Sequence, residues 1–178
     1  MTAAGTNSEA LFQRYGPTYR WLVTLTVMTG AIAMGLASSM VNVAVPSVMG
    51  AFGVGFDQAQ WMATGFLASM SATMVLSSWL IEVLGQRITF IITLSVFTTG
   101  CFISATAPNI DIMILGRVMQ GAATGVGQPL AMFSIFGVFP PERRGMALGI
   151  YGLVSVLAPT FGPILGGIAI DTMSWRYL

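Results

Sequence analysis

The sequence predicts an all-α membrane protein, a polytopic bundle of transmembrane helices, and three observations lead to this prediction. Apolar residues make up 55% of the chain and charged residues only 7%, whereas soluble domains carry about 25% charged residues. Five stretches without a charged residue each exceed the roughly 20 residues that a helix needs to cross a bilayer. These stretches are 21–56, 58–81, 88–110, 118–141 and 145–170. The arginines between them collect on one side of the predicted membrane.

Transmembrane spans are placed mainly within these uncharged stretches, and the fourth span also includes Arg117. They are predicted at 21–45, 58–81, 88–107, 112–137 and 145–170. Residues 1–19 are polar and form a predicted cytoplasmic tail, and residues 20–178 form one transmembrane domain. The last residues, 171–178, are rich in aromatic side chains, which favours the start of a sixth helix. We therefore expect an incomplete six-helix bundle from a longer chain.

The distribution of arginines predicts the orientation in the membrane. The arginines on the side of the N-terminus are Arg14, Arg20, Arg87, Arg143 and Arg144. The opposite side has only Arg176, together with Asp57, Asp111 and Asp171. Because loops rich in Lys and Arg stay in the cytoplasm, the N-terminus is predicted to be cytoplasmic.

The composition also excludes several kinds of chemistry. The chain has no histidine, no lysine and a single cysteine, Cys101. Histidine-based acid–base catalysis, a lysine Schiff base and cysteine or histidine metal sites are therefore excluded. A net charge of +1 does not indicate a nucleic-acid partner. We expect no enzyme activity and no cofactor.

The fourth predicted span has a polar or small face. Its members are Arg117, Gln120, Gly121, Thr124, Gly125 and Gln128, and their spacing places them on one side of an α-helix. A cation inside a span costs about 2.5–3.5 kcal/mol on insertion scales, so it is expected to face protein or water. We favour a role for this face in a transport path. The alternative is that Arg117 only holds helices together through backbone carbonyls.

The fifth predicted span combines prolines and glycines. Pro159 and Pro163 each remove one helical hydrogen bond, and Gly162 and Gly166 form a small-xxx-small pair that lets another backbone approach closely. This pattern predicts a kinked helix at a tight helix interface. It fits a rocking transporter and a purely structural interface equally well.

These motifs resemble those of the major facilitator superfamily, specifically its drug:proton antiporters of the fourteen-helix branch. The antiporter motif of the fifth helix corresponds to Gly149, Ala158, Gly162, Pro163, Gly166 and Gly167, with Ala158 in place of the usual glycine. Leu115, Arg117, Gln120 and Gly121 match the arginine motif of the fourth helix. The loop 140–145 and residues 60–64 are similar to the family's loop between helices four and five and to the start of its second helix. The resemblance covers nearly the whole chain.

Two family motifs are altered. The loop 78–87 is similar to the superfamily signature between helices two and three, where the family forms an ion-pair latch on the cytoplasmic face. The resemblance implies that Glu82, Gly85 and Arg87 form a weaker latch here, because two basic positions are lost; the alternative is a solvated turn. In the first span, Asn42 matches the family motif, but Ala37 stands where an aspartate is usual.

The resemblance implies the N-terminal part of a fourteen-helix efflux transporter in the plasma membrane of a bacterium, its inner membrane. The implied partners are a hydrophobic drug-like substrate, protons, the lipid bilayer and, as a candidate, a periplasmic adaptor protein. Arg117, Gln120, Thr124, Gln128 and Asn42 are then expected along the transport path. No carboxylate lies deep in a predicted span, so either another part of the protein supplies the carboxylate for proton coupling, or the coupling is altered. The alternatives are a membrane subunit or scaffold without transport activity, favoured if the chain naturally ends at Leu178, and an intramembrane enzyme, which ranks last.

Overall fold

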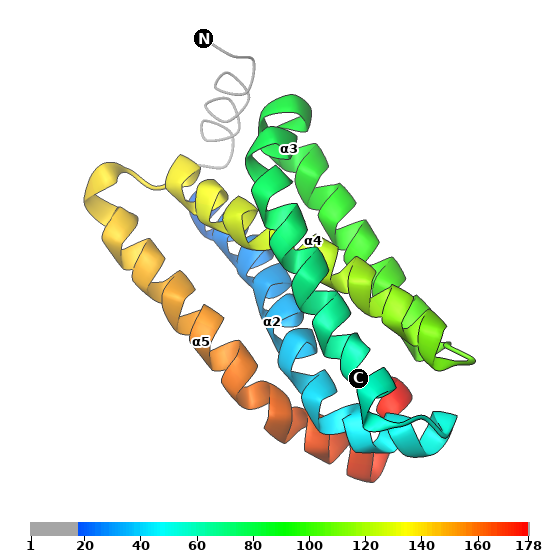
Figure 1. The fold of residues 1–178 in the computed structure, drawn as a ribbon. Helices are drawn as coiled ribbons and strands as arrows, with labels where there is room; N and C mark the ends of the chain where they lie inside the picture. The colour runs from blue at the N-terminus through cyan, green and yellow to red at the C-terminus, as the bar shows by residue number, and fades with distance from the viewer. Residues whose placement is uncertain (1–17, 178) are drawn as a thin grey trace.

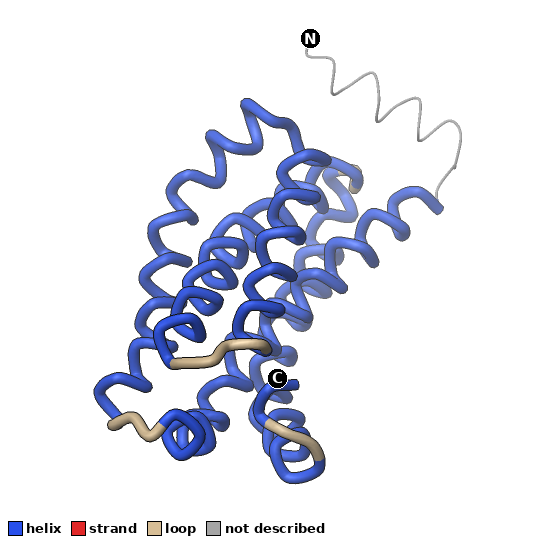
Figure 2. Tube along the Cα trace, turned by 90° about the vertical axis from the view of Figure 1, so that its right-hand side faces the viewer, coloured by secondary structure: helices blue, strands red, loops and turns tan. Residues whose placement is uncertain are grey.

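The computed structural model describes residues 18–177, which are helical almost throughout and contain no strand. The elements are α2 (Thr18–Phe52), α3 (Phe56–Ala105), α4 (Ile110–Val138), α5 (Pro141–Thr172) and the 3₁₀-helix η1 (Trp175–Tyr177). Figures 1 and 2 show long helices joined by short loops. The all-α prediction is therefore confirmed for the described part of the chain.

Helix α3 is a helical hairpin. Its 50 residues would span about 75 Å if they were straight, at 1.5 Å per residue, which is more than twice the thickness of a bilayer core. Gly85 interrupts the helix with φ 77° and ψ 160°, a conformation that glycine adopts without steric cost. The chain turns back at this point (Figure 1). We call residues 56–84 the first leg and residues 86–105 the second leg.

Several helices are longer than the predicted spans. Helix α2 begins at Thr18, within the predicted tail, and continues through Pro46 to Phe52. The first span was predicted to end at residue 45, one residue before Pro46, and proline ordinarily disfavours the helix interior. Proline is tolerated in transmembrane helices, since neighbouring groups can satisfy the carbonyl that it frees. The remaining residues of the predicted tail, 1–17, lie outside the described part of the chain.

The last two long helices also include prolines. Helix α4 contains Pro129, and α5 contains both Pro159 and Pro163 without an interruption of the helix. Asn109 precedes α4, and its side chain accepts a hydrogen bond of 3.0 Å from the backbone N–H of Ile112. This is a regular N-cap, which satisfies one of the free N–H groups of the first turn.

Helix α4 is the most enclosed of the helices. It packs mainly against α3 and also against α2, while α5 packs mainly on α2. Glycines of α4 allow this close packing: a Cβ atom on Gly121 or Gly125 would collide with backbone carbonyls of the first leg, and one on Gly116 would lie 2.7 Å from the carbonyl of Gly100 in the second leg. The polar residues of α4 therefore lie inside the bundle.

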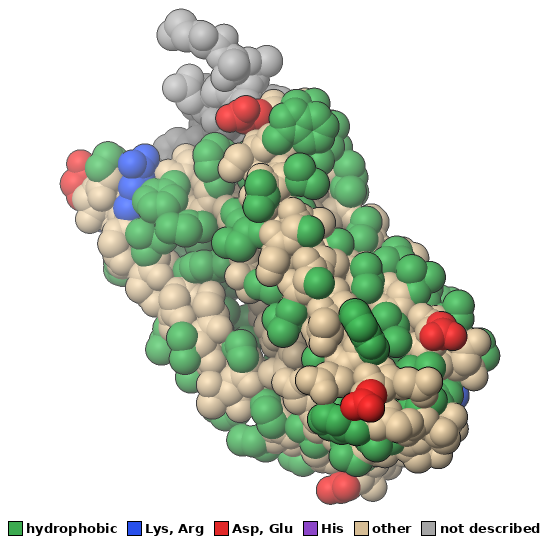
Figure 3. Space-filling view, viewed as in Figure 1, with side chains coloured by type: hydrophobic (Ala, Val, Ile, Leu, Met, Phe, Trp, Pro, Cys, Tyr) green, Lys and Arg blue, Asp and Glu red, His purple; other side chains and the backbone are tan. Residues whose placement is uncertain are grey.

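The outer surface suits lipid. Three helices are long and apolar enough to cross a membrane, namely Trp21–Phe52, α3 and α5. Helix α4 does not meet this criterion; it carries Arg117 and several other polar residues, and its neighbours cover it. Large apolar side chains such as Val75, Trp79 and Phe102 are exposed, and apolar atoms are spread over the face shown in Figure 3. Such extensive apolar exposure identifies a multi-pass membrane protein rather than a soluble one.

We expect that Gly121→Val destabilises the protein by about 1–3 kcal/mol or more, because the added side chain collides with the Phe66 carbonyl and overpacks the contact between α3 and α4. Thermal unfolding of the purified full-length protein in detergent measures this effect. The control is Gly50→Val in α2, because a Cβ atom there meets nothing within 4 Å. Equal loss of stability in both variants would mean that only helix propensity, and no tight contact, is involved.

Candidate functional site

Arg117 is the centre of the candidate site, and its side chain is only 2% exposed. Its Nη1 donates a hydrogen bond of 3.1 Å to the carbonyl of Ala37 in α2 and another to Oε1 of Gln120. Its Cζ lies 4.4 Å from the centre of the Phe66 ring in the first leg of α3. The guanidinium thus connects three elements through a carbonyl, an amide and an aromatic face.

The contact with Ala37 has a particular meaning for the altered first-helix motif. Ala37 stands where the family that the sequence resembles has an aspartate, and its backbone carbonyl accepts the hydrogen bond from Arg117. A carbonyl supplies a partial negative charge but no counter-ion. The cost of burying this cation is therefore reduced by dipoles and by a cation–π contact. None of these groups is an anion, so the positive charge has no counter-ion at this point.

The carboxylates of the described residues differ from buried Arg117 in their exposure to solvent. All of them are exposed, at or near the ends of helices or of the α3 legs: Asp57, Glu82, Asp111, Glu142 and Asp171.

Two buried polar atoms lack a hydrogen-bond partner. They are Nε of Arg117 and Oγ of Ser104 in the second leg. Buried polar atoms without partners are rare in proteins, so both atoms mark this place as unusual.

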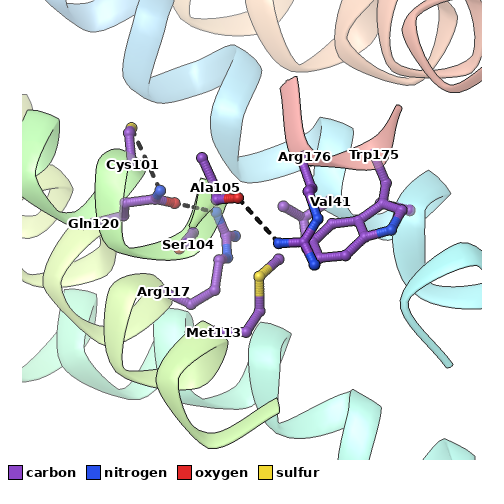
Figure 4. Close-up of a pocket in the computed structure, with 10 residues that line it drawn as sticks. Val41, Cys101, Ser104, Ala105, Met113, Arg117, Gln120, Trp175 and Arg176 are labelled. Atoms are coloured by element: carbon purple, nitrogen blue, oxygen red, sulfur yellow. Dashed lines mark hydrogen bonds between the residues drawn. The ribbon is translucent and has the colours of Figure 1, made fainter. Parts of the chain in front are cut away.

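A pocket of about 140 Å³ lies beside Arg117 (Figure 4). Its lining residues come from α2, the second leg of α3, α4 and the segment at η1. They are Val41, Ala44, Cys101, Ser104, Ala105, Met113, Arg117, Gln120, Trp175 and Arg176. Within this lining, Nε2 of Gln120 donates a hydrogen bond of 3.4 Å to Sγ of Cys101.

The segment at η1 forms one side of the pocket. The Trp175 ring packs edge-on against Phe52 of α2, with 5.4 Å between the ring centres. Nη1 of Arg176 donates hydrogen bonds to the carbonyls of Ala105, at 3.2 Å, and Ala107, at 3.0 Å. The structure therefore places this aromatic segment, predicted as the start of a sixth helix, in a 3₁₀ turn against the pocket. The sixth helix itself stays a prediction.

The predicted polar face of α4 divides into parts with different surroundings. Arg117 and Gln120 line the pocket. Thr124 is buried, and its hydroxyl donates to the carbonyl of Gln120 within the same helix. Gln128 is exposed, and its backbone carbonyl accepts a hydrogen bond of 3.2 Å from the Tyr151 hydroxyl of α5. The structure thus brings two of these four side chains together at the pocket.

The glycines of this face have a packing role. Gly121 and Gly125 contact the first leg, as described above, and Oγ1 of Thr73 in that leg donates a hydrogen bond of 2.9 Å to the carbonyl of Ala122. This is an interhelical contact between close backbones, of the kind that small residues four apart allow. The face predicted for a transport path therefore also serves helix packing.

The predicted antiporter motif of α5 has two sides. Ala158, Gly162 and Gly166 are buried, and a Cβ atom on Gly162 would collide with Oγ of Ser39 in α2. The predicted small-xxx-small interface is therefore present. Gly149, Pro163 and Gly167 lie outside this interface. A Cβ atom on either glycine meets nothing within 4 Å, and Pro163 is exposed.

The remaining predicted residues lie on the surface of the described bundle. Glu82 and Arg87 flank the turn at Gly85, and both side chains are exposed, so the latch stays a prediction. Asn42 is exposed on α2, away from the Arg117 pocket. Its role in a transport path is likewise untested.

Several residues of the site were not predicted from the sequence. They are Phe66, Cys101, Ser104, Met113, Trp175 and Arg176. A signal existed for Ser104, because it follows Gly100 by four residues inside an apolar span, which is the spacing of a helix interface. No local signal distinguishes Phe66 or Met113 from other apolar residues of their spans.

Chemically, the arrangement can bind and orient a ligand. It offers a buried cation and hydrogen-bond donors inside an apolar bundle, and the described residues include no group of three metal-binding side chains. These are properties of a binding site within a membrane.

Comparison with known proteins adds the family context. Residues 9–178 match the family model described as Major Facilitator Superfamily. The chain is similar to the MFS-type transporter YhcA of Bacillus subtilis, at 38% identity over 86% of this chain and 29% of that protein. It is also similar to YcnB of the same organism, at 35% identity over 91% and 34%, and to the multidrug export protein EmrB of Haemophilus influenzae, at 32% over 88% and 31%. The chain thus spans about a third of the length of these relatives.

Proposed function

Since this chain belongs to the major facilitator superfamily, we propose that it forms the N-terminal part of a transporter, not an enzyme, that exports hydrophobic drug-like molecules in exchange for protons. The observation that carries the proposal is the enclosed Arg117 with its adjacent pocket, in a chain similar to a multidrug export protein. A charge buried in an apolar bundle is costly, so such residues usually belong to substrate or ion pathways.

The proposal includes five transmembrane spans and the start of a sixth. The two legs of α3 supply two spans, and α2, α4 and α5 supply one each. The legs measure about 40 Å and 30 Å at 1.5 Å per residue, and each is long enough for the hydrocarbon core. The N-terminus and the loop between α4 and α5 then lie in the cytoplasm, and the membrane is the bacterial inner membrane. A periplasmic adaptor is a further proposed partner.

Proton coupling requires a group that gains and loses a proton inside the membrane. Burial can raise the pKa of a carboxyl group into the working range, but the carboxylates of the described residues are exposed. We therefore assign the coupling carboxylate to the remainder of the full-length protein. Arg117, in the N-terminal part of the protein, would interact electrostatically with this carboxylate.

Transport by the full-length protein in proteoliposomes tests the proposal. With an imposed pH gradient, we expect movement of a fluorescent hydrophobic dye against its own gradient, and loss of this movement when a protonophore is added. Empty liposomes serve as the control. Correctly inserted protein that moves none of a panel of hydrophobic dyes, with or without the gradient, would contradict the proposed function.

The orientation yields a separate prediction. In a Cys101→Ala background, we expect Arg143→Cys, in the first turn of α5, to resist a membrane-impermeant thiol reagent in intact cells and to react after permeabilisation, because the arginine distribution predicts a cytoplasmic position. Asp111→Cys, near the opposite end of α4, is the matched position and is expected to react in intact cells. The reverse labelling pattern would overturn the topology.

A further inference from the structure

The pocket beside Arg117 carries positive charge without a counter-ion. Arg117 and Arg176 both belong to its lining, and none of the ten lining residues has a carboxylate. Nearby groups that interact with Arg117 are neutral: the Ala37 carbonyl, the Gln120 amide and the Phe66 ring. Within an apolar bundle, electrostatic attraction is stronger than in water, so a negative charge in this pocket would be strongly favoured.

Two buried hydrogen-bond donors beside the pocket, one on α3 and one on α4, have no acceptor. Nε of Arg117 and Oγ of Ser104 are buried, and neither has a hydrogen-bond partner. The side chains themselves are 2% and 8% exposed, so both donors have lost most contact with bulk solvent. A guanidinium N–H and a hydroxyl that both need an acceptor fit the oxygen atoms of a carboxylate, which only accepts hydrogen bonds.

The size and the other walls of the pocket limit what can accompany such a group. A volume of about 140 Å³ is close to that of an engineered protein cavity that holds benzene. Apolar side chains, including Val41, Met113 and Trp175, form the rest of the lining (Figure 4). A ring or short alkyl chain would contact these residues while the charged end meets the arginine.

Arg176 is held where it can attract anions to this pocket. Its Nη1 is fixed by the carbonyls of Ala105 and Ala107 at the end of the second leg, and its Cζ lies 4.5 Å from the centre of the Trp175 ring. Its side chain is exposed, in contrast to the buried Arg117. The pocket thus has one cation in its interior and one at its solvent-exposed edge.

We propose that this pocket binds a small organic acid with an apolar body of about one ring, whose carboxylate accepts hydrogen bonds from Arg117 and Ser104. The inference deepens the proposed function and rests on it, because it assigns the exported substrates to amphiphiles that carry a carboxylate. It also gives the altered motif at Ala37 a consequence: where an aspartate would neutralise Arg117, the alanine leaves that charge available to a ligand.

The test is equilibrium binding of radiolabelled benzoate to the purified full-length protein in detergent at neutral pH. We expect saturable binding that unlabelled benzoate displaces. Benzyl alcohol has a similar shape without charge, and benzylamine carries the opposite charge; neither should compete. Competition by either compound at the concentration at which benzoate competes would overturn the proposal, and so would the absence of saturable benzoate binding.

Two variants connect the binding to this pocket. Ser104→Ala should weaken benzoate binding at least about tenfold, because a hydrogen bond to a charged group is lost. Ala105→Leu should weaken it similarly by filling the pocket, while both arginines remain. Arg143→Gln, which removes an exposed arginine outside the pocket, should leave the affinity unchanged. Parent-like affinity in both pocket variants, with parent-like thermal stability, would place benzoate elsewhere and overturn the assignment.

The two proposals can fail separately. Export of dyes without benzoate binding would remove the inference about the pocket and leave the proposed function intact. Benzoate binding without any transport in proteoliposomes would contradict the proposed function and retain the anion site. Chloride, added at the same concentration as unlabelled benzoate, distinguishes the organic acid from a simple inorganic anion. Displacement of labelled benzoate by chloride at that concentration would overturn the proposed class of ligand.

Discussion

Replacing Arg117 with alanine is expected to reduce export by about a hundredfold or more, while membrane insertion stays normal or improves. The guanidinium makes charge-assisted contacts to α2 and α4, and the loss of hydrogen bonds to a charged group costs about 1.5–3 kcal/mol each. Insertion should not suffer, because the cation itself is unfavourable in a span by about 2.5–3.5 kcal/mol. Initial rates of dye export, normalised to the amount of inserted full-length protein, measure the effect.

Two further variants separate charge from geometry. Arg117→Lys keeps the positive charge but lacks the planar fork of donors, so we expect partial activity between the parent and Arg117→Ala. Arg143→Ala removes an exposed arginine in the first turn of α5 and should export at the parent rate. If Arg117→Ala also exports at the parent rate, Arg117 has only the structural role that the sequence left as an alternative.

The helical architecture was largely predictable because its signal is local. Long uncharged stretches cover most of α2, of both legs of α3, of α4 and of α5, and the turn at Gly85 falls inside the charged interval from Glu82 to Arg87. Helix ends were less predictable. The first span was predicted to end at residue 45, yet α2 continues through Pro46 to Phe52, because neighbouring groups can compensate for a missing hydrogen bond inside a membrane protein.

The candidate site was only partly predictable, because it depends on contacts between distant segments. The spacing of Arg117 and Gln120 indicated a common face, and both do line one pocket. Periodicity could not reveal that Gly121 and Gly125 on that face pack against α3. It also could not reveal that the carbonyl of Ala37 accepts from an arginine eighty residues later, because backbone atoms carry no sequence signature.

The contact between α5 and α2 leads to the second large effect. Gly162→Leu is expected to block export while ligand binding is retained. A Cβ atom at Gly162 already collides with Oγ of Ser39 and lies 3.3 Å from the Leu36 carbonyl, so a leucine must push the two helices apart. Overpacking of this kind typically costs about 1–3 kcal/mol or more, and in a transporter it changes the balance between conformations that bring these helices together or separate them.

Binding should survive because the two contacts of α2 lie on nearly opposite sides of that helix. Ser39 faces Gly162 of α5, whereas the Ala37 carbonyl is bonded to Arg117, and two residues along an α-helix correspond to a rotation of about 200°. The strain is therefore expected to arise away from the pocket.

Drug binding and drug efflux, measured on the same purified full-length variant, test this prediction. Gly162→Ala should have a milder effect than Gly162→Leu, because the Ser39 hydroxyl can rotate away from a methyl group. Gly152→Leu is the matched control in the same helix, since a Cβ atom there meets nothing within 4 Å. Loss of both binding and efflux in a folded Gly162→Leu protein would indicate a direct role in binding. Unchanged efflux would show that the tight packing between α5 and α2 does not constrain the transport cycle.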